Sequence, residues 1–287
     1  MKIQLTDLEG VSPAFLQMRK RNWTEKRGIG AKEKKMNMKF NCIPKLLLVI
    51  AMLVVGKSAK AYDCEVDGIF YYRISANELE VANKVFSDQN RTAYTGSVTI
   101  PSTVTYNGKS FNVVSIGEFA FRDCTGLTAI TIPNSIRSIK NYAFYNCSQL
   151  SAITIPTSVN EIGEGAFEGC ASVTQMVLPE GLPSIEAELF FGCVNMRSVV
   201  IPTSVASIGE NSFSRCSSLI SIYCKPSSAP ACDNNAFAKV DRTWCTLYVP
   251  KEAKSYEEDS EWKSFFIEAM PDQIEELTKE IPKFAQQ

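Results

Sequence analysis

LSAITIPTSVNEIGEGAFEGCAS, residues 150–172, is the stretch that decides the fold, because the chain repeats it with little change. Related units begin at Leu127, Val173 and Met196, with a constant step of 150 − 127 = 23 residues, and a fifth copy opens at Leu219. A fixed period of this length indicates a solenoid, in which each coil buries its apolar face only against its neighbours.

Phenylalanine and cysteine keep the same period. The phenylalanines are Phe121, Phe144, Phe167, Phe190 and Phe213, and the cysteines, each three residues later, are Cys124, Cys147, Cys170, Cys193 and Cys216. Unpaired cysteine behaves as a small buried hydrophobe. Stacked coils would also run the Cβ vectors of these cysteines parallel, which does not suit disulfides. We therefore expect a buried ladder of thiols. The pairing of Cys64, Cys224, Cys232 and Cys245 stays open, with a Cys224–Cys232 or Cys232–Cys245 bridge as an alternative.

Each unit contains two different periodicities. Ile153 and Ile155 alternate as in a short strand, and Pro156 ends the strand because proline has no N–H to donate to a ladder. The string S-V-x-x-I-G follows as a bend, and the apolar spacing in A-F-x-x-C predicts one helical turn. Each coil would therefore be strand, bend, turn and bend, and the stacked strands would form a parallel sheet.

The string LxxIxIPxSVxxIGxxAFxxC resembles the leucine-rich repeats of the BspA type, found in bacterial surface proteins and some protozoan ones. The resemblance covers roughly residues 97–267 and implies an α/β, β-rich, right-handed leucine-rich-repeat solenoid with a parallel sheet. It also implies a role in adhesion to host matrix proteins or other cells. The third copy departs from the pattern at Met176, Leu178, Gly181, Pro183 and Leu189.

The chain before the repeats divides into two parts. Residues 1–35 are basic and lack a sustained period, so they are either unstructured or the product of a start codon placed too early, with Met1, Met36 and Met38 as candidate starts. Residues 36–61 have the features of a signal peptide: flanking lysines, a short apolar run at 46–55, and small residues before a cleavage site between Ala61 and Tyr62. The rival reading is an uncleaved anchor with a cytoplasmic tail.

Four segments follow the cleavage site. Residues 62–96 form an N-terminal β-hairpin cap, with Asp67-Gly68 as the turn, and 97–223 form the solenoid of 23-residue units. Asn107-Gly108 predicts a hairpin inserted into the first coil. Residues 224–267 form the last coil and a C-terminal cap, in which Trp262, Phe265 and Phe266 have helical spacing and are expected to pack in the core. Residues 268–287 form a short helix or a disordered tail.

Composition excludes several kinds of site. The chain has no histidine, which excludes histidine bases, triads and metal ligands. Residues 62–287 carry 17 basic and 27 acidic residues, a net charge of 17 − 27 = −10, so nucleic acid is not expected as a partner. We predict no catalytic, cofactor or metal site, and no transmembrane span in the mature form.

The outward positions of the strands are the candidate ligand-binding residues, because they project from the exposed side of the sheet. They are Thr131, Thr154, Gln175, Val177, Ser198, Val200, Ser221 and Tyr223. The main hypothesis is an exported, secreted or cell-surface, non-catalytic protein that binds an extracellular protein or glycan. The alternatives are a catalytic or accessory component of extracellular polysaccharide handling, and a structural spacer in an envelope assembly. The oligomeric state stays open.

Overall fold

A computed structural model of the chain describes residues 62–83, 94–233 and 235–271. All of them belong to the second of two compact units, residues 58–287. The expected signal peptide, including Ala61, and residues 272–287 of the expected tail lie outside the described residues. In the described part of the chain, no helix is long and apolar enough to cross a membrane.

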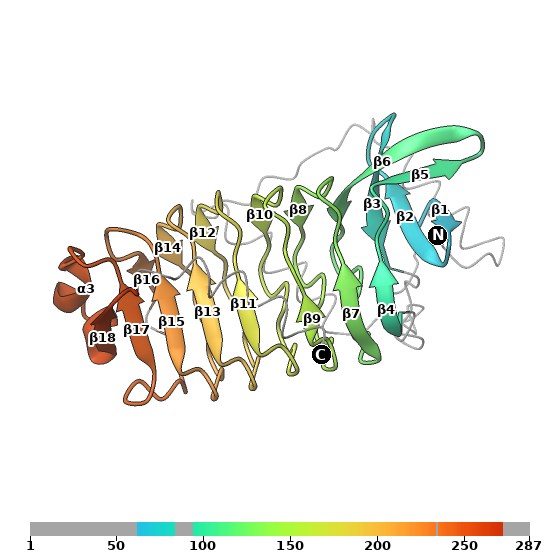
Figure 1. The fold of residues 1–287 in the computed structure, drawn as a ribbon. Helices are drawn as coiled ribbons and strands as arrows, with labels where there is room; N and C mark the ends of the chain where they lie inside the picture. Colours follow the sequence, from blue (N-terminus) through green and yellow to red (C-terminus); the bar gives the residue numbers. More distant parts are fainter. Residues whose placement is uncertain (1–61, 84–93, 234, 272–287) are drawn as a thin grey trace, which may run out of the picture. The chain divides into compact units, whose positions relative to one another are not determined.

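The repeats stack as coils whose longer strands form parallel sheets (Figure 1). The first of these sheets contains β4 (Gly96–Thr99), β7 (Leu127–Thr131) and β9 (Ala152–Ile153). The second contains β11 (Gln175–Val177), β13 (Ser198–Ile201), β15 (Ser221–Cys224), β17 (Thr246–Val249) and β18 (Phe266–Ala269). The parallel sheet expected from the repeat is confirmed.

A second ladder of shorter strands runs along the coils where the sequence predicted only a bend. It contains β6 (Lys109–Ile116), β8 (Ser138–Ile139) and β10 (Glu161–Ile162), and then β12 (Ser184–Ile185), β14 (Ser207–Ile208) and β16 (Ala231–Cys232). Its isoleucines are buried, and flanking amides donate to the preceding coil, as Gly163 N does to Ile139 O at 2.8 Å. Strands of two residues are too short to show a periodicity.

The N-terminal cap is a three-stranded meander of β1 (Cys64–Val66), β2 (Ile69–Arg73) and β3 (Glu78–Ala82). Its last strand pairs in parallel with β6 and so extends the ladder of short strands. The hairpin at Asp67-Gly68 is confirmed, with φ of 52° and 77°. The inserted hairpin is also confirmed, because Asn107-Gly108, with φ of 51° and 73°, joins β5 (Thr103–Tyr106) to β6.

The C-terminal cap contains less helix than its sequence spacing suggested. It consists of α3 (Ser255–Glu258), the 3-10 turn η2 (Trp262–Ser264) and then strand β18. Trp262 and Phe265 are buried as expected, and Trp262 Nε1 donates to Pro230 O at 2.9 Å. The expectation for Phe266 is wrong: it begins β18 and is 60% exposed. A further strand thus follows the last coil, and it spans the boundary expected at residue 268.

The periodic phenylalanines form one column of stacked rings inside the coils. Successive centroids from Phe121 to Phe213 lie 5.0, 5.3, 5.7 and 5.5 Å apart, and Phe237 continues the column at 5.2 Å. Each buried cysteine from Cys147 to Cys216 donates its thiol to the phenylalanine carbonyl of the preceding coil, at 3.0–3.2 Å. Cys147, Cys170, Cys193 and Cys216 are thiols, which confirms the thiol ladder. Cys224, Cys232 and Cys245 are also thiols, so neither alternative bridge is formed.

The A-F-x-x-C segment is a run of tight turns, which corrects the expected helical turn. Two residues per coil adopt left-handed backbone, for example Tyr142 (φ 54°) and Asn146 (φ 56°), or Gly165 (φ 58°) and Gly169 (φ 72°). Left-handed residues four positions apart interrupt an α-helix. Alternate amides instead donate to the next coil, as Phe144 N does to Ala166 O at 2.8 Å.

Candidate binding face

The outward side chains of the longer strands form two rows along the coils, in register within each of the two sheets, which we call the outer face. The first row is Ala129, Ala152, Gln175, Ser198, Ser221, Thr246 and Phe266. The second row is Thr131, Thr154, Val177, Val200, Tyr223, Tyr248 and Glu268. Before Glu268 neither row contains a charged residue. Along the face the side chains change from small and polar in the first coils to aromatic in the last.

The structure places most of the predicted site residues within reach of solvent. Thr131 and Thr154 are exposed, and Gln175, Val177, Ser198, Ser221 and Tyr223 are half-buried. Val200 is the exception, because it is 1% exposed and the prediction of an accessible position is wrong there. Its in-register neighbours in the row are Val177 and Tyr223, and apolar side chains on both sides leave it little contact with water.

Sequence reasoning missed the second half of an aromatic pair on this face. The rings of Tyr223 and Tyr248 stack with centroids 4.8 Å apart and planes 10° apart. Each ring has a further in-register neighbour, Val200 beside Tyr223 and Glu268 beside Tyr248. Burial, with the nearby Glu268 carboxylate, raises the pKa of the Tyr248 hydroxyl. The pair is therefore half-buried, with one face of each ring covered by the other ring. The restored strand CTLYVP was the sequence signal for it.

Two larger apolar side chains are exposed near the same end of the outer face. Phe266 pairs in register with Thr246, and Trp244, two residues before Thr246, is 76% exposed. Ile220 is also exposed, and its carbonyl accepts a hydrogen bond from Thr246 N at 2.9 Å. Exposed apolar side chains that gather within one or two coils are typical of contact surfaces.

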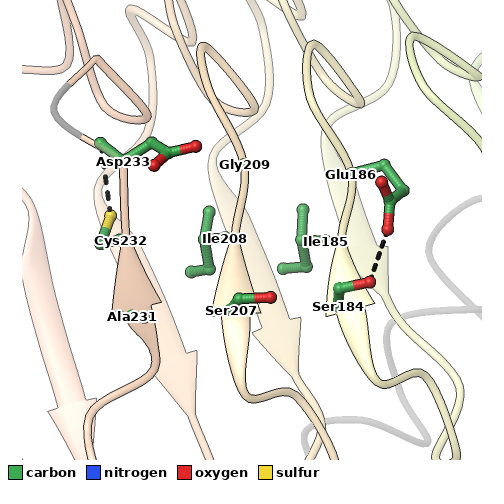
Figure 2. A pocket seen from close by; sticks show the side chains of 9 residues that line it. All are labelled: Ser184, Ile185, Glu186, Ser207, Ile208, Gly209, Ala231, Cys232 and Asp233. Carbon is green, nitrogen blue, oxygen red and sulfur yellow. Dashed lines mark hydrogen bonds between the residues drawn. The ribbon is translucent and has the colours of Figure 1, made fainter. Parts of the chain in front are cut away.

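A shallow groove of about 210 Å³ lies over the short strands β12, β14 and β16 (Figure 2). Glu186 and Asp233 flank it on either side of Gly209, and Ser184 donates its hydroxyl to Glu186. Facing carboxylates are the arrangement that glycoside hydrolysis would require. Both side chains are exposed, however, whereas a general acid of this kind is normally desolvated.

A polar cluster lies on the turn side of the coils. The hydroxyl of Tyr142 donates to Glu164 Oε1 at 2.6 Å, and Glu188 Oε2 lies 3.3 Å from the same tyrosine hydroxyl oxygen. Burial, together with the carboxylates of Glu188 and Glu164, raises the pKa of Glu168 to about 7, while the Arg122 guanidinium opposes the shift. Within the described residues, no group of three or more histidine, cysteine or acidic side chains is arranged to hold a metal ion.

Comparison with known proteins identifies the repeat. Residues 83–220 and 141–259 match a family model described as the BspA type leucine rich repeat region, in six copies. The chain belongs to this BspA-type leucine-rich repeat family. No curated protein matches it.

Solved structures similar to this BspA-type chain include leucine-rich repeat proteins and a vaccine antigen. A leucine-rich repeat protein of T. pallidum is 18% identical with a TM-score of 0.49, over 76% of this chain and 95% of its own. A leucine rich cell surface protein of Faecalibacterium prausnitzii is 20% identical with a TM-score of 0.40, over 68% and 72%. The pneumococcal vaccine antigen PcpA is 18% identical with a TM-score of 0.36, over 68% and 52%. None of these matches indicates a catalytic function.

Proposed function

We propose that this BspA-type protein is exported, acts outside the cell or at its surface, and binds an extracellular protein or glycan without catalysing a reaction. The observation that carries the proposal is the outer face. None of its side chains before Glu268 is charged, and its C-terminal end carries the stacked pair Tyr223 and Tyr248 beside the exposed Phe266. Tyrosine and other aromatic side chains dominate the energetics of protein contacts.

The geometry of the tyrosine pair favours a protein partner over a glycan. A sugar that stacks on an aromatic residue needs an open ring face. In Tyr223 and Tyr248 one face of each ring lies against the other ring, and Val200 and Glu268 follow on the two outer sides of the row. Ring edges and hydroxyls suit a polypeptide surface with apolar groups and hydrogen-bond acceptors.

The catalytic alternative has one supporting observation, the groove between Glu186 and Asp233. Because both carboxylates are exposed and the groove is shallow, binding is the better proposal for this surface as well. A purified chain that hydrolyses polysaccharides, and loses that activity in Glu186→Gln, would revive the catalytic reading.

Binding of the full chain to arrayed extracellular matrix proteins and glycans tests the proposal. We expect at least one protein to bind, and Tyr248→Ala to weaken that binding by about 2 kcal/mol, roughly thirty-fold, as loss of a central contact residue does. Thr131→Ala, at the opposite end of the outer face, is the matched control and should bind normally. Absence of binding across the array, or equal losses in both variants, would count against the outer face as the binding surface.

A further inference from the structure

Both ladders of strands stop at the same place along the solenoid. The longer strands end at β9 and resume at β11, and the short strands end at β10 and resume at β12 (Figure 1). Both gaps fall between the coil of residues 150–172 and the coil of residues 173–195, which we call the 172/173 junction. At the two junctions on each side of it, both ladders continue.

Pro183 explains the gap between the short strands. The residues at its position in the neighbouring coils donate their amides to the preceding coil: Asn160 N to Arg137 O at 3.0 Å, and Ala206 N to Pro183 O at 2.9 Å. Proline has no amide hydrogen, so the corresponding bond across the 172/173 junction is chemically impossible. The departure of the third copy from the repeat pattern therefore has a structural consequence.

A cleft of about 360 Å³ opens beside this gap. Its lining residues come from both sides of the junction and include Asn160, Glu161 and Glu164 on one side, and Pro183 and Glu186 on the other. The phenylalanine column also has its widest step here, 5.7 Å between Phe167 and Phe190.

The turn side carries the hydrogen bonds that tie the two coils together. Gly165, Phe167 and Gly169 donate their amides to the next coil at 3.0, 3.0 and 2.8 Å. The Cys193 thiol adds a bond to Phe167 O at 3.2 Å. One edge of the junction is thus tied while two sheets are interrupted, which is the arrangement of a hinge.

The acidic cluster lies at that tied edge. Glu164 and Glu168 belong to one coil and Glu188 to the other, so ionised carboxylates repel each other across the junction. The charged or titratable groups around Glu168 are Glu164, Glu188, Arg122, Tyr142, Tyr145, and the Cys193 thiol, with Asp123 paired to Arg122. Arg122 is the cation in this set, and it interacts from two coils away.

We propose that the 172/173 junction is a pH-sensitive hinge, whose tied edge holds when Glu168 is protonated and loosens when Glu168 ionises. The hinge divides the solenoid into a half that carries the N-terminal cap and a half that carries the aromatic end of the outer face. Because burial and the neighbouring carboxylates raise the pKa of Glu168 to about 7, conditions outside a cell cover both of its protonation states. Acidification therefore strengthens the tied edge, and neutral or alkaline conditions favour opening of its hydrogen bonds.

Hydrogen exchange of the full chain, followed by mass spectrometry at pH 5.5 and pH 8 and corrected for intrinsic exchange rates, tests the hinge. The amides of Gly165, Phe167 and Gly169 should open about tenfold more readily at pH 8, since opening releases the ionised carboxylate to water. The amides of Phe190 and Gly192 make the same kind of bond at the next junction, at 2.8 and 2.9 Å, and should show no such change. Equal protection of the 165–169 segment at both pH values would overturn the proposal.

Two variants and one control separate the effect of the Glu168 charge from the effect of the missing amide at Pro183. Glu168→Gln should abolish the pH dependence of hydrogen exchange in the 165–169 segment. Glu210→Gln, which replaces an exposed carboxylate in the coil of residues 196–218, should leave that pH dependence intact. Pro183→Asn restores the missing amide with the residue that coil 150–172 carries at Asn160, and should increase protection of the segment at both pH values. Persistence of the pH effect in Glu168→Gln, or no gain in Pro183→Asn, would show that the hinge is wrongly explained.

Discussion

Replacement of one ring in the phenylalanine column tests whether that column supports the coils. Phe167 is fully buried, with ring centroids of Phe144 and Phe190 at 5.3 and 5.7 Å. Phe167→Ala removes the side chain from a packed interior and leaves a cavity, at a cost of about 3–5 kcal/mol in the free energy of unfolding. It also removes two ring contacts, each worth roughly 0.5–1.5 kcal/mol beyond the buried area, so we expect the upper part of that range.

Urea denaturation followed by circular dichroism and fluorescence measures this loss. For an m-value of roughly 2 kcal/mol/M, a loss of about 4 kcal/mol moves the midpoint down by about 2 M. Tyr223→Ala is the matched control, because its half-buried ring lies on the outer face, and it should cost about 1 kcal/mol. Midpoint shifts of equal size for the two variants would refute the assignment of inner and outer positions.

Three further predictions follow from individual contacts. Gly163→Ala should destabilise the fold by about 1–3 kcal/mol, because an added Cβ would fall 2.6 Å from the Asn141 backbone nitrogen; Gly192→Ala, which meets nothing within 4 Å but has φ of 73°, should cost about 1 kcal/mol in the same denaturation assay. Among the described cysteines, a thiol reagent should react in the native state only with the half-buried Cys232, and slowly, because burial raises the pKa of the Cys232 thiol to about 12. Rapid labelling of Cys170 or Cys193 in the native protein, measured by mass spectrometry, would contradict the buried thiol ladder. The pKa of Glu168 is about 7 in the folded protein and about 4.5 in the unfolded chain, so the contribution of this residue to the free energy of unfolding falls as pH rises from 4.5 to 7. Glu168→Gln should flatten this part of the plot of stability against pH, and an unchanged slope would show that Glu168 is not its source.

The period of the sequence predicted the architecture because the same apolar side chains recur at every coil. Phe144 and Phe167 have buried positions that follow from the step alone, and so do the thiols three residues after them. The hairpins at Asp67-Gly68 and Asn107-Gly108 were also predictable, because their turns need two residues with positive φ.

The turns and the outer face were harder to predict for physical reasons. Gly165 and Gly169 hint at left-handed backbone, but Tyr142 and Glu188 adopt it without glycine, because contacts with neighbouring coils fix their conformation. The helical spacing of the apolar residues therefore led to the wrong prediction of a helical turn in the A-F-x-x-C segment. The burial of Val200 depends on side chains that come from two other coils, so the sequence of a single repeat does not predict it.

The hinge region shows how a departure from the repeat becomes structure. Pro183 was visible as an exception in the third copy, and its missing amide predicts a lost bond. The loss could be placed only after the short strands were known to form a ladder, because a proline in an ordinary bend has no such consequence.

Deletion of one whole coil tests the central claim, that each coil is a unit that buries its apolar face only against its neighbours. Removal of residues 196–218, one period of 23, joins Asn195 to Leu219 in the same phase of the repeat. We predict that this variant unfolds in one cooperative thermal transition with a β-rich circular dichroism spectrum, whereas removal of residues 196–207 alone, about half a coil, abolishes that transition. Loss of cooperative unfolding in the whole-coil deletion, with retention in the half-coil deletion, would contradict the account.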